Sequence, residues 1–181
     1  TDIDIIVYGK NRGKVAVINE LIEGAETEIV ALSDASAMLE RDALERSVAY
    51  FADTTVGVVC PTYQLMQPGS EGEAAYWRYQ AKVKANEAIV AGGPLGAHGA
   101  FYLFRRSAWR PLPADTINDD FILPSRILEA GLCGIYDPTI VTRELERTDR
   151  RQEFRRRIRI GAGNMQQAVR LASWAWYSHP G

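Results

Sequence analysis

The feature that most constrains the fold is the alternation of strand-type and helix-type apolar patterns over the first sixty residues. Ile3–Tyr8 and Ile29–Ser33 are short apolar runs rich in β-branched residues, a pattern typical of buried strands. The segment 14–25 between them repeats apolar residues at helical spacing, and a second helical stripe precedes a third strand at Val56–Val59. This order predicts an α/β fold in which a mostly parallel central sheet is flanked by helices.

The rest of the chain mixes the same two patterns, without an internal repeat or a low-complexity linker. Helices are expected at 73–90 and 117–130, and strands at 101–106, 133–136 and 140–144. The arginine-rich segment 147–170 is expected to be mainly helical. One compact domain of 181 residues accommodates all of these elements.

Composition and charge limit the function classes. The chain has 21 Lys and Arg against 23 Asp and Glu, a net charge of -2, which argues against a globally basic nucleic-acid-binding protein. Cys60 and Cys133 are far apart and indicate neither a disulfide framework nor a cysteine-based zinc site, which fits a reducing compartment. Glycine and proline break the longest uncharged run, 88–104, so no transmembrane helix is expected, and no secretory signal is visible at Thr1.

Two acidic positions are candidates for chemistry. Asp34 follows a predicted strand, where ligands of α/β sheets bind, and its carboxylate suits a divalent cation or a sugar hydroxyl. Capping of the next turn by Asp34 or Ser33 is an equal alternative. Asn118-Asp119-Asp120 precedes an apolar helix, and one of two adjacent carboxylates can act as a general base toward a hydroxyl. Helix N-capping is the alternative there.

A local cationic cluster, Arg155 to Arg159, stands out in this otherwise balanced chain. Arginine side chains match phosphate oxygens well, which favours a diphosphate or an anionic membrane surface as partner. A solvated helix face that pairs with nearby acidic residues is the alternative, and RNA binding is disfavoured by the acidic remainder. His98 lies in a glycine-rich segment, and we expect a structural role for it rather than metal binding.

In order along the chain, the segments GKVAVIN, IVALSDAS, GAHGAFYLFRR, INDDFILPSRILEAGLCGIYDP and RRRIRIGAGNMQQ resemble the inverting family 2 glycosyltransferases, which include the cellulose, chitin and hyaluronan synthases. The resemblance implies the GT-A fold, a Rossmann-like α/β fold. It further implies a donor-side part at 1–60, an acceptor and catalytic part at 61–146, and an arginine-rich helical segment at 147–181.

The same resemblance assigns a donor site. Lys14 and Asn19 match the GK…N stretch beside the nucleotide, and Asp34-Ala35-Ser36 takes the place of the DxD motif. Asp34 is the expected metal ligand and donor contact, for Mg²⁺ or Mn²⁺. Ser36 stands where the family has its second carboxylate and is the weaker oxygen ligand for a hard cation.

The resemblance also assigns the catalytic residues. Asp120 corresponds to the catalytic base of the TED motif, and Asp119 to the preceding acidic residue that shapes the acceptor site, together with Gly99. Arg156, Arg159 and Ile160 fall at the Gln, Arg and Trp positions of the QxxRW motif. Arg156 and Arg159 are expected to bind the donor diphosphate, and the two departures from this motif favour non-processive transfer.

The implied partners are a UDP-sugar donor and a glycan or lipid-linked acceptor, with no nucleic acid. The family's first nucleotide-binding unit would lie before Thr1, and contact with a membrane, at its cytoplasmic face, would involve regions outside this chain. A non-catalytic nucleotide-sugar-binding or scaffold domain is the main alternative, because of Ser36 and the altered QxxRW region. Binding of RNA or an anionic membrane through the arginines is a third possibility.

Overall fold

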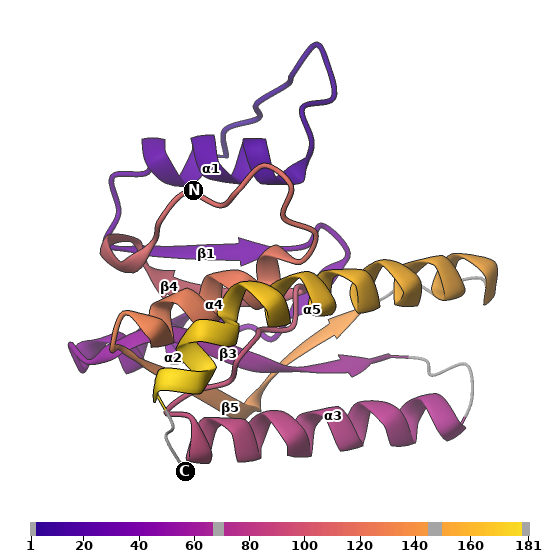
Figure 1. The fold of residues 1–181 in the computed structure, drawn as a ribbon. Helices are drawn as coiled ribbons and strands as arrows, with labels where there is room; N and C mark the ends of the chain where they lie inside the picture. Colours follow the sequence, from indigo (N-terminus) through magenta and orange to yellow (C-terminus); the bar gives the residue numbers. More distant parts are fainter. Residues whose placement is uncertain (1–2, 67–70, 145–149, 179–181) are drawn as a thin grey trace.

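The computed structural model describes residues 3–66, 71–144 and 150–178 as a five-stranded sheet flanked by helices (Figure 1). The elements follow one another as α1 (Lys14–Gly24), β1 (Ile29–Ser33), β2 (Ala37–Leu39), α2 (Ala43–Ala49), β3 (Val56–Leu65), α3 (Glu71–Val90), β4 (Phe101–Arg105), α4 (Asp119–Glu129), β5 (Cys133–Glu144) and α5 (Arg150–Ser178). Two short 3₁₀ turns, η1 (Tyr50–Ala52) and η2 (Arg106–Ala108), follow α2 and β4.

The sheet is mixed rather than mostly parallel. Its strand order is β1-β4-β3-β5-β2, and only β3 and β5 pair in parallel, whereas β4 is antiparallel to both of its neighbours and β2 is antiparallel to β5. The α/β class is confirmed, whereas the expectation of a mostly parallel sheet was wrong, because three of the four strand pairings are antiparallel. Apolar runs reveal a buried strand and carry no information on its direction.

Two apolar clusters hold the helices to the sheet. Side chains alternate along the central strands, so Val58 and Phe104 join the larger cluster with α1 and α4, while Val59 and Leu103 join the smaller one beside η1. Because β3 and β4 are covered on both faces, they read as continuous apolar runs in the sequence.

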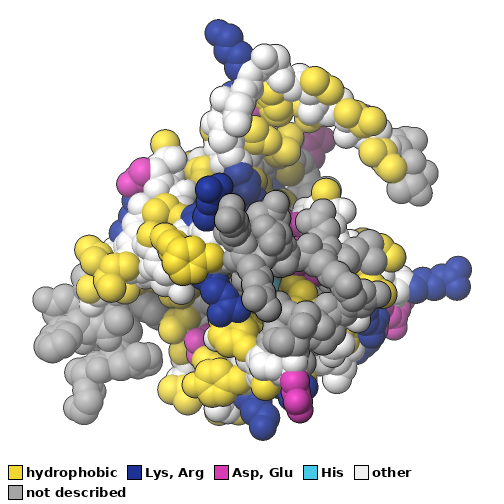
Figure 2. Space-filling model, turned by 90° about the vertical axis from the view of Figure 1, so that its right-hand side faces the viewer, with side chains coloured by type: hydrophobic (Ala, Val, Ile, Leu, Met, Phe, Trp, Pro, Cys, Tyr) yellow, Lys and Arg dark blue, Asp and Glu magenta, His cyan; other side chains and the backbone are white. Residues whose placement is uncertain are grey.

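The first predicted strand, Ile3–Tyr8, is absent from the structure. This segment has no regular secondary structure, and Ile3, Ile5 and Val7 are more than four-fifths exposed. Its apolar side chains project at the top of the molecule in Figure 2. A strand forms only where it has a partner to hydrogen-bond, and no described strand lies beside this segment.

The other elements agree with the predicted ones, with local differences. The two strands expected at 133–136 and 140–144 form one strand, β5, whose register with β3 shifts between Pro61 and Thr62. The short edge strand β2 was not predicted. The start of the arginine-rich segment, 147–149, lies outside the described residues, and the remainder to 170 is helical in α5. Among the described helices, none is long and apolar enough to cross a membrane.

The strand directions bring the chemistry-bearing segments to one edge of the sheet. β1, β3 and β5 run the same way, so Asp34, Tyr63 and Glu144 all lie at or near their carboxyl ends. The antiparallel β4 begins at this edge, directly after the glycine-rich segment that contains His98 and Gly99. This edge therefore holds the candidate site.

Candidate functional site

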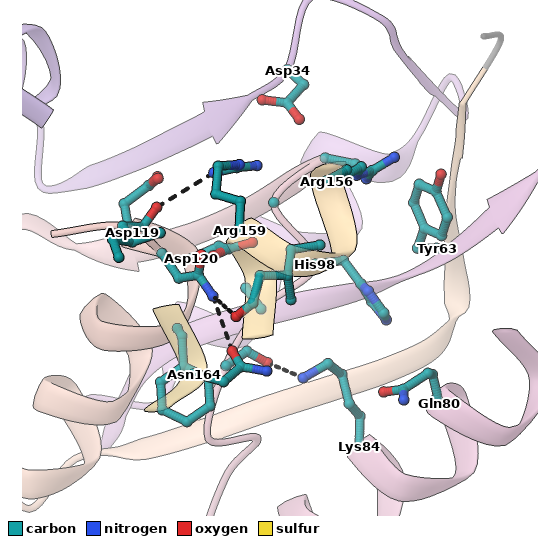
Figure 3. Close-up of a pocket in the computed structure, with 18 of the residues that line it drawn as sticks. Asp34, Tyr63, Gln80, Lys84, His98, Asp119, Asp120, Arg156, Arg159 and Asn164 are labelled. Carbon is teal, nitrogen blue, oxygen red and sulfur yellow. Dashed lines mark hydrogen bonds between the residues drawn. The ribbon is translucent and has the colours of Figure 1, made fainter. Parts of the chain in front are cut away.

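A pocket of about 340 Å³ opens at this edge of the sheet. Side chains from β3, α3, β5 and α5 line it, together with the ends of α1, β1 and α4 (Figure 3). Seven of the nine residues predicted to form the donor, acceptor and catalytic sites meet there, namely Lys14, Asp34, Gly99, Asp119, Asp120, Arg156 and Arg159. These residues span 145 positions of the chain, from 14 to 159, and the fold alone brings them together.

Asp120 is held in the pocket at the first turn of α4. Burial, reinforced by the neighbouring Asp119 charge, raises the pKa of Asp120 to about 6, while Lys14, Lys84 and Arg159 oppose the rise. Gly99 makes room for this carboxylate, because a Cβ atom at position 99 would lie 2.8 Å from Asp120 Oδ2. At neutral pH the carboxylate is ionised yet basic enough to accept a proton.

The position of the acidic pair depends on contacts of α4 with two other segments. The Ala97 amide donates to Asp120 O at 2.7 Å, which ties the glycine-rich segment to the start of the helix. Asn118, immediately before α4, donates to Ile160 O and to Asn164 Oδ1 of α5. The predicted helix start is therefore confirmed, although the Asn118 side chain bonds α5 instead of capping α4.

Four cationic side chains line the same pocket, those of Lys14, Lys84, Arg156 and Arg159. Lys14 Nζ lies 3.1 Å from Asp119 Oδ2 and 3.9 Å from Asp34 Oδ1, so it bridges the ends of β1 and α4. Arg156 lies 3.9 Å from Glu144, and Arg159 contacts the Ile117 carbonyl at 3.5 Å. Asp119 is buried, and its pairing with Lys14 offsets part of the cost of burying its carboxyl group.

Two predicted donor-site residues have other partners. The Asn19 amide donates to Leu112 O at 2.8 Å and accepts from Leu112 N at 2.9 Å, outside the pocket lining. Ser36 also lies outside the lining, and its hydroxyl donates to Glu144 Oε1 at 3.4 Å. Asn19 thus joins α1 to the loop before α4, which is a structural role.

Several pocket residues were not found in the sequence. Glu144, at the end of β5, accepts a hydrogen bond from the Tyr63 hydroxyl and faces Arg156. Tyr63, Trp77 and Lys84 come from β3 and α3 and line the pocket beside His98. The end of a predicted strand was the only signal for Glu144, and nothing in the local sequence distinguishes Trp77 from a core aromatic residue.

Comparison with known proteins identifies the family of this chain. Residues 1–163 match the model of the family described as Glycosyltransferase like family 2. The pre-mycofactocin glycosyltransferase of Mycobacterium tuberculosis is 27% identical over 180 residues, which cover 93% of this chain and 38% of that protein. The mannosyltransferase PcManGT from Pyrobaculum calidifontis, solved in complex with GDP-Man and Mn²⁺, has a TM-score of 0.67 and 26% identity, covering 90% of this chain and 45% of that one.

The chain thus spans less than half the length of the relatives that it matches. The family match extends over most of its own residues and includes every predicted pocket residue from Lys14 to Arg159. The chain belongs to glycosyltransferase family 2.

Proposed function

We propose that this chain carries the catalytic site of an inverting glycosyltransferase, with Asp120 as the general base. The observation that carries the proposal is the placement of a carboxylate with a pKa of about 6 in a pocket that four cationic side chains also line. Such a pocket combines a proton acceptor with groups that bind a nucleoside diphosphate. The similarity to PcManGT, whose structure contains GDP-Man, supports a nucleotide-sugar donor.

In the proposed reaction, the Asp120 carboxylate takes the proton of an acceptor hydroxyl. The acceptor oxygen forms a bond to the anomeric carbon on the side opposite the diphosphate, and the bond between that carbon and the diphosphate oxygen breaks. The electron pair leaves with the nucleoside diphosphate, and the configuration at the anomeric carbon is inverted. The pocket contributes by holding donor and acceptor in line with Asp120.

Positive charge is available for the leaving diphosphate. Arg156 and Arg159 lie one turn apart on the pocket side of α5, and arginine forms paired hydrogen bonds with phosphate oxygens. Lys14 adds a third positive charge while it holds Asp119 and Asp34. Donors that are fixed before the reaction stabilise the developing charge without reorganisation.

A divalent cation fits the site through Asp34. Its carboxylate lines the pocket, is half exposed, and has only Lys14 at 3.9 Å as an ionic partner among the described residues. The Ser36 hydroxyl instead contacts Glu144, and the described residues contain no group of three or more His, Cys, Asp or Glu that could hold a metal. Asp34, with diphosphate oxygens, would hold Mg²⁺ or Mn²⁺, and the bound cation would supply further charge neutralisation.

The nucleotide of the donor, UDP or GDP, can be identified by comparing the binding of two nucleotide-sugars. The family resemblance favours a UDP-sugar, whereas the similar PcManGT structure contains GDP-Man. Titration of the chain with UDP-glucose and GDP-mannose, with and without Mn²⁺, distinguishes the two donors. We expect a glycan or a lipid-linked saccharide as acceptor.

The Asp120→Asn variant tests the proposed role of Asp120 as the general base. We expect its rate of transfer to fall at least about a hundredfold, because the amide cannot accept the proton, with donor affinity changed much less. Transfer is measured as release of nucleoside diphosphate, and donor affinity by calorimetry. Glu129→Gln is the matched control, since it removes an exposed carboxylate from the other end of the same helix. Equal turnover by Asp120→Asn and wild type would exclude the role of Asp120.

A further inference from the structure

One wall of the pocket is built from four aromatic side chains that the proposed chemistry does not use. Tyr63 comes from β3, Tyr76 and Trp77 from α3, and His98 from the segment before β4. We call these residues the aromatic platform. Ring centroids are 4.5 Å apart for Tyr63 and Trp77, 5.6 Å for Tyr63 and His98, and 5.4 Å for Tyr76 and Trp77.

Core packing does not explain the platform. None of its residues belongs to the two apolar clusters of the described chain, and all four line the pocket. Tyr76 is 42% exposed, and Trp77 is partly exposed. Tyr63 is only 4% exposed, so the exposed ring surface of the platform lies on the other three residues, and Arg157 Cζ is 5.4 Å from the centroid of the Tyr76 ring. Burying the exposed face of an aromatic ring against a ligand is favourable, so these three rings can provide binding energy.

The rings of the platform are themselves uncharged, although charged groups lie beside two of them. Arg157 lies beside the Tyr76 ring, and Glu144, which accepts a hydrogen bond from Tyr63, lies 3.9 Å from Arg156. Burial lowers the pKa of His98 to about 3, so its imidazole is neutral at physiological pH. Burial, and the hydrogen bond to Glu144, raise the pKa of Tyr63, so its hydroxyl stays protonated. The nearby Lys84 donates to the Gly96 carbonyl and lies 3.9 Å from Glu87. In the view of Figure 3, Tyr63 and His98 lie to the right of Asp119 and Asp120.

A polar group beside the platform indicates which neutral ligand it suits. Gln80, one turn after Trp77 on α3, lines the pocket and makes no hydrogen bond to any described residue. Its amide can donate to one hydroxyl and accept from another. A sugar ring presents C–H groups on its face and hydroxyls around its edge, so it can contact the aromatic rings and the amide together.

We infer that the aromatic platform and Gln80 form the acceptor subsite, and that the acceptor presents an uncharged sugar ring there with one hydroxyl directed at Asp120. The inference rests on the proposed function, because Asp120 defines which part of the pocket faces the acceptor. It assigns the donor diphosphate to the side of Lys14 and Arg159, and the acceptor to the side of α3.

Direct binding of probes, without donor, tests the subsite independently of transfer. The probes are methyl α-mannopyranoside and methyl β-glucopyranoside, observed by saturation-transfer NMR on the full chain. We expect the sugar signal to be lost in Trp77→Leu and in Tyr76→Leu, and to return in Trp77→Phe, which keeps a ring. Tyr79→Leu is the matched control, because Tyr79 lies on the same helix, is 62% exposed and is outside the pocket lining. Its signal should equal that of the wild type.

Kinetics give the second readout once a transfer assay is in hand. We expect Trp77→Leu and Gln80→Leu to raise the acceptor KM about three- to tenfold with a smaller change in kcat. An unchanged acceptor KM in both variants would overturn the inference even if Asp120 proves to be the base. Stronger binding of 4-ethylphenol or of glucuronate than of both methyl glycosides would also overturn it, in favour of an aromatic or a charged acceptor. Failure of wild-type transfer, with sugar binding lost as expected, would count against the proposed function alone.

Discussion

Asp120 combines a useful pKa with a cost in stability. In the native chain its pKa is about 6, above the ordinary value of 3.8, because burial and Asp119 disfavour the charged form. An unfolded chain releases this proton at lower pH than the native chain does. The ionisation of Asp120 therefore lowers the free energy of unfolding as the pH rises from about 4 through 6. This loss of stability is complete at neutral pH.

This cost predicts that Asp120→Asn is more stable than the wild type at neutral pH. We expect the free energy of unfolding to increase by roughly 1–3 kcal/mol at pH 7.5, because the neutral amide has no charge to bury. Below pH 4 the difference should disappear, since Asp120 is then protonated in both states. Urea unfolding at the two pH values measures this, with Glu129→Gln as the control for a general charge effect. A variant less stable than the wild type at pH 7.5 would contradict the burial argument.

Single residues also show what the sequence could and could not reveal. Asp34 and the pair Asp119 and Asp120 were identifiable because they stand at the ends of predicted elements, and the structure places them in one pocket. Asn19 was assigned to the donor site through its motif, yet its side-chain amide forms hydrogen bonds with the backbone of Leu112, 93 positions away. Tyr63 and Trp77 carried no local signal, and Glu144 had only its place at the end of a predicted strand. Long-range partners decide such cases, and they follow from the fold rather than from spacing.

Among the elements, apolar periodicity predicted the helices and central strands but neither strand direction nor pairing. β1, β3, β4 and β5 are where the pattern placed them, because a buried strand must be apolar whichever way it runs. The segment Ile3–Tyr8 has the same pattern, yet it is largely exposed and pairs with no strand of the described residues. The strand β2 lies at the sheet edge and has only three residues, of which Met38 and Leu39 are exposed, so it is too short to give a strand pattern in the sequence.

The contact between α4 and α5 depends on one glycine. A Cβ atom at position 163 would lie 2.3 Å from Asn118 Cγ, so only glycine lets α5 approach the residue that precedes the acidic pair. Asn118 is buried and bonds α5 through Ile160 and Asn164. The geometry of Asp119 and Asp120 is therefore coupled to the packing of the arginine-bearing helix.

Gly163→Ala should accordingly disturb both stability and transfer. We expect a loss of about 1–3 kcal/mol from the clash, and a fall in kcat/KM of about ten- to a hundredfold as Asn118 and the acidic pair move. Gly161→Ala is the control on the same helix, because a Cβ atom there meets nothing within 4 Å. It should stabilise the chain by up to about 1 kcal/mol, since alanine favours a helix over glycine. Equal effects of the two substitutions on thermal unfolding and transfer would refute the coupling.

At the scale of the whole molecule, the two edges of the sheet at which its strands begin and end have different roles. One edge carries the pocket, at the carboxyl ends of β1, β3 and β5. At the other edge, where β4 ends, the buried Arg105 donates to the carbonyls of Val56, Phe51 and Asp53 and pairs with Glu28. This side chain joins β4 to the start of β3 and to the turn η1.

Separation of the two edges predicts that Arg105→Met lowers stability without changing the pocket. Removal of the guanidinium leaves buried carbonyls without a donor, so we expect a loss of about 2–4 kcal/mol in the free energy of unfolding. The exposed Glu28 contributes little to that loss, because surface ion pairs are weak. Donor affinity, measured by calorimetry well below the melting temperature, should stay at the wild-type value. Arg110→Met, at an exposed position with no hydrogen bond to a described residue, should change neither quantity. A parallel loss of stability and donor affinity in Arg105→Met would show instead that the two edges of the sheet are coupled, and that the pocket depends on the rigidity of the whole sheet.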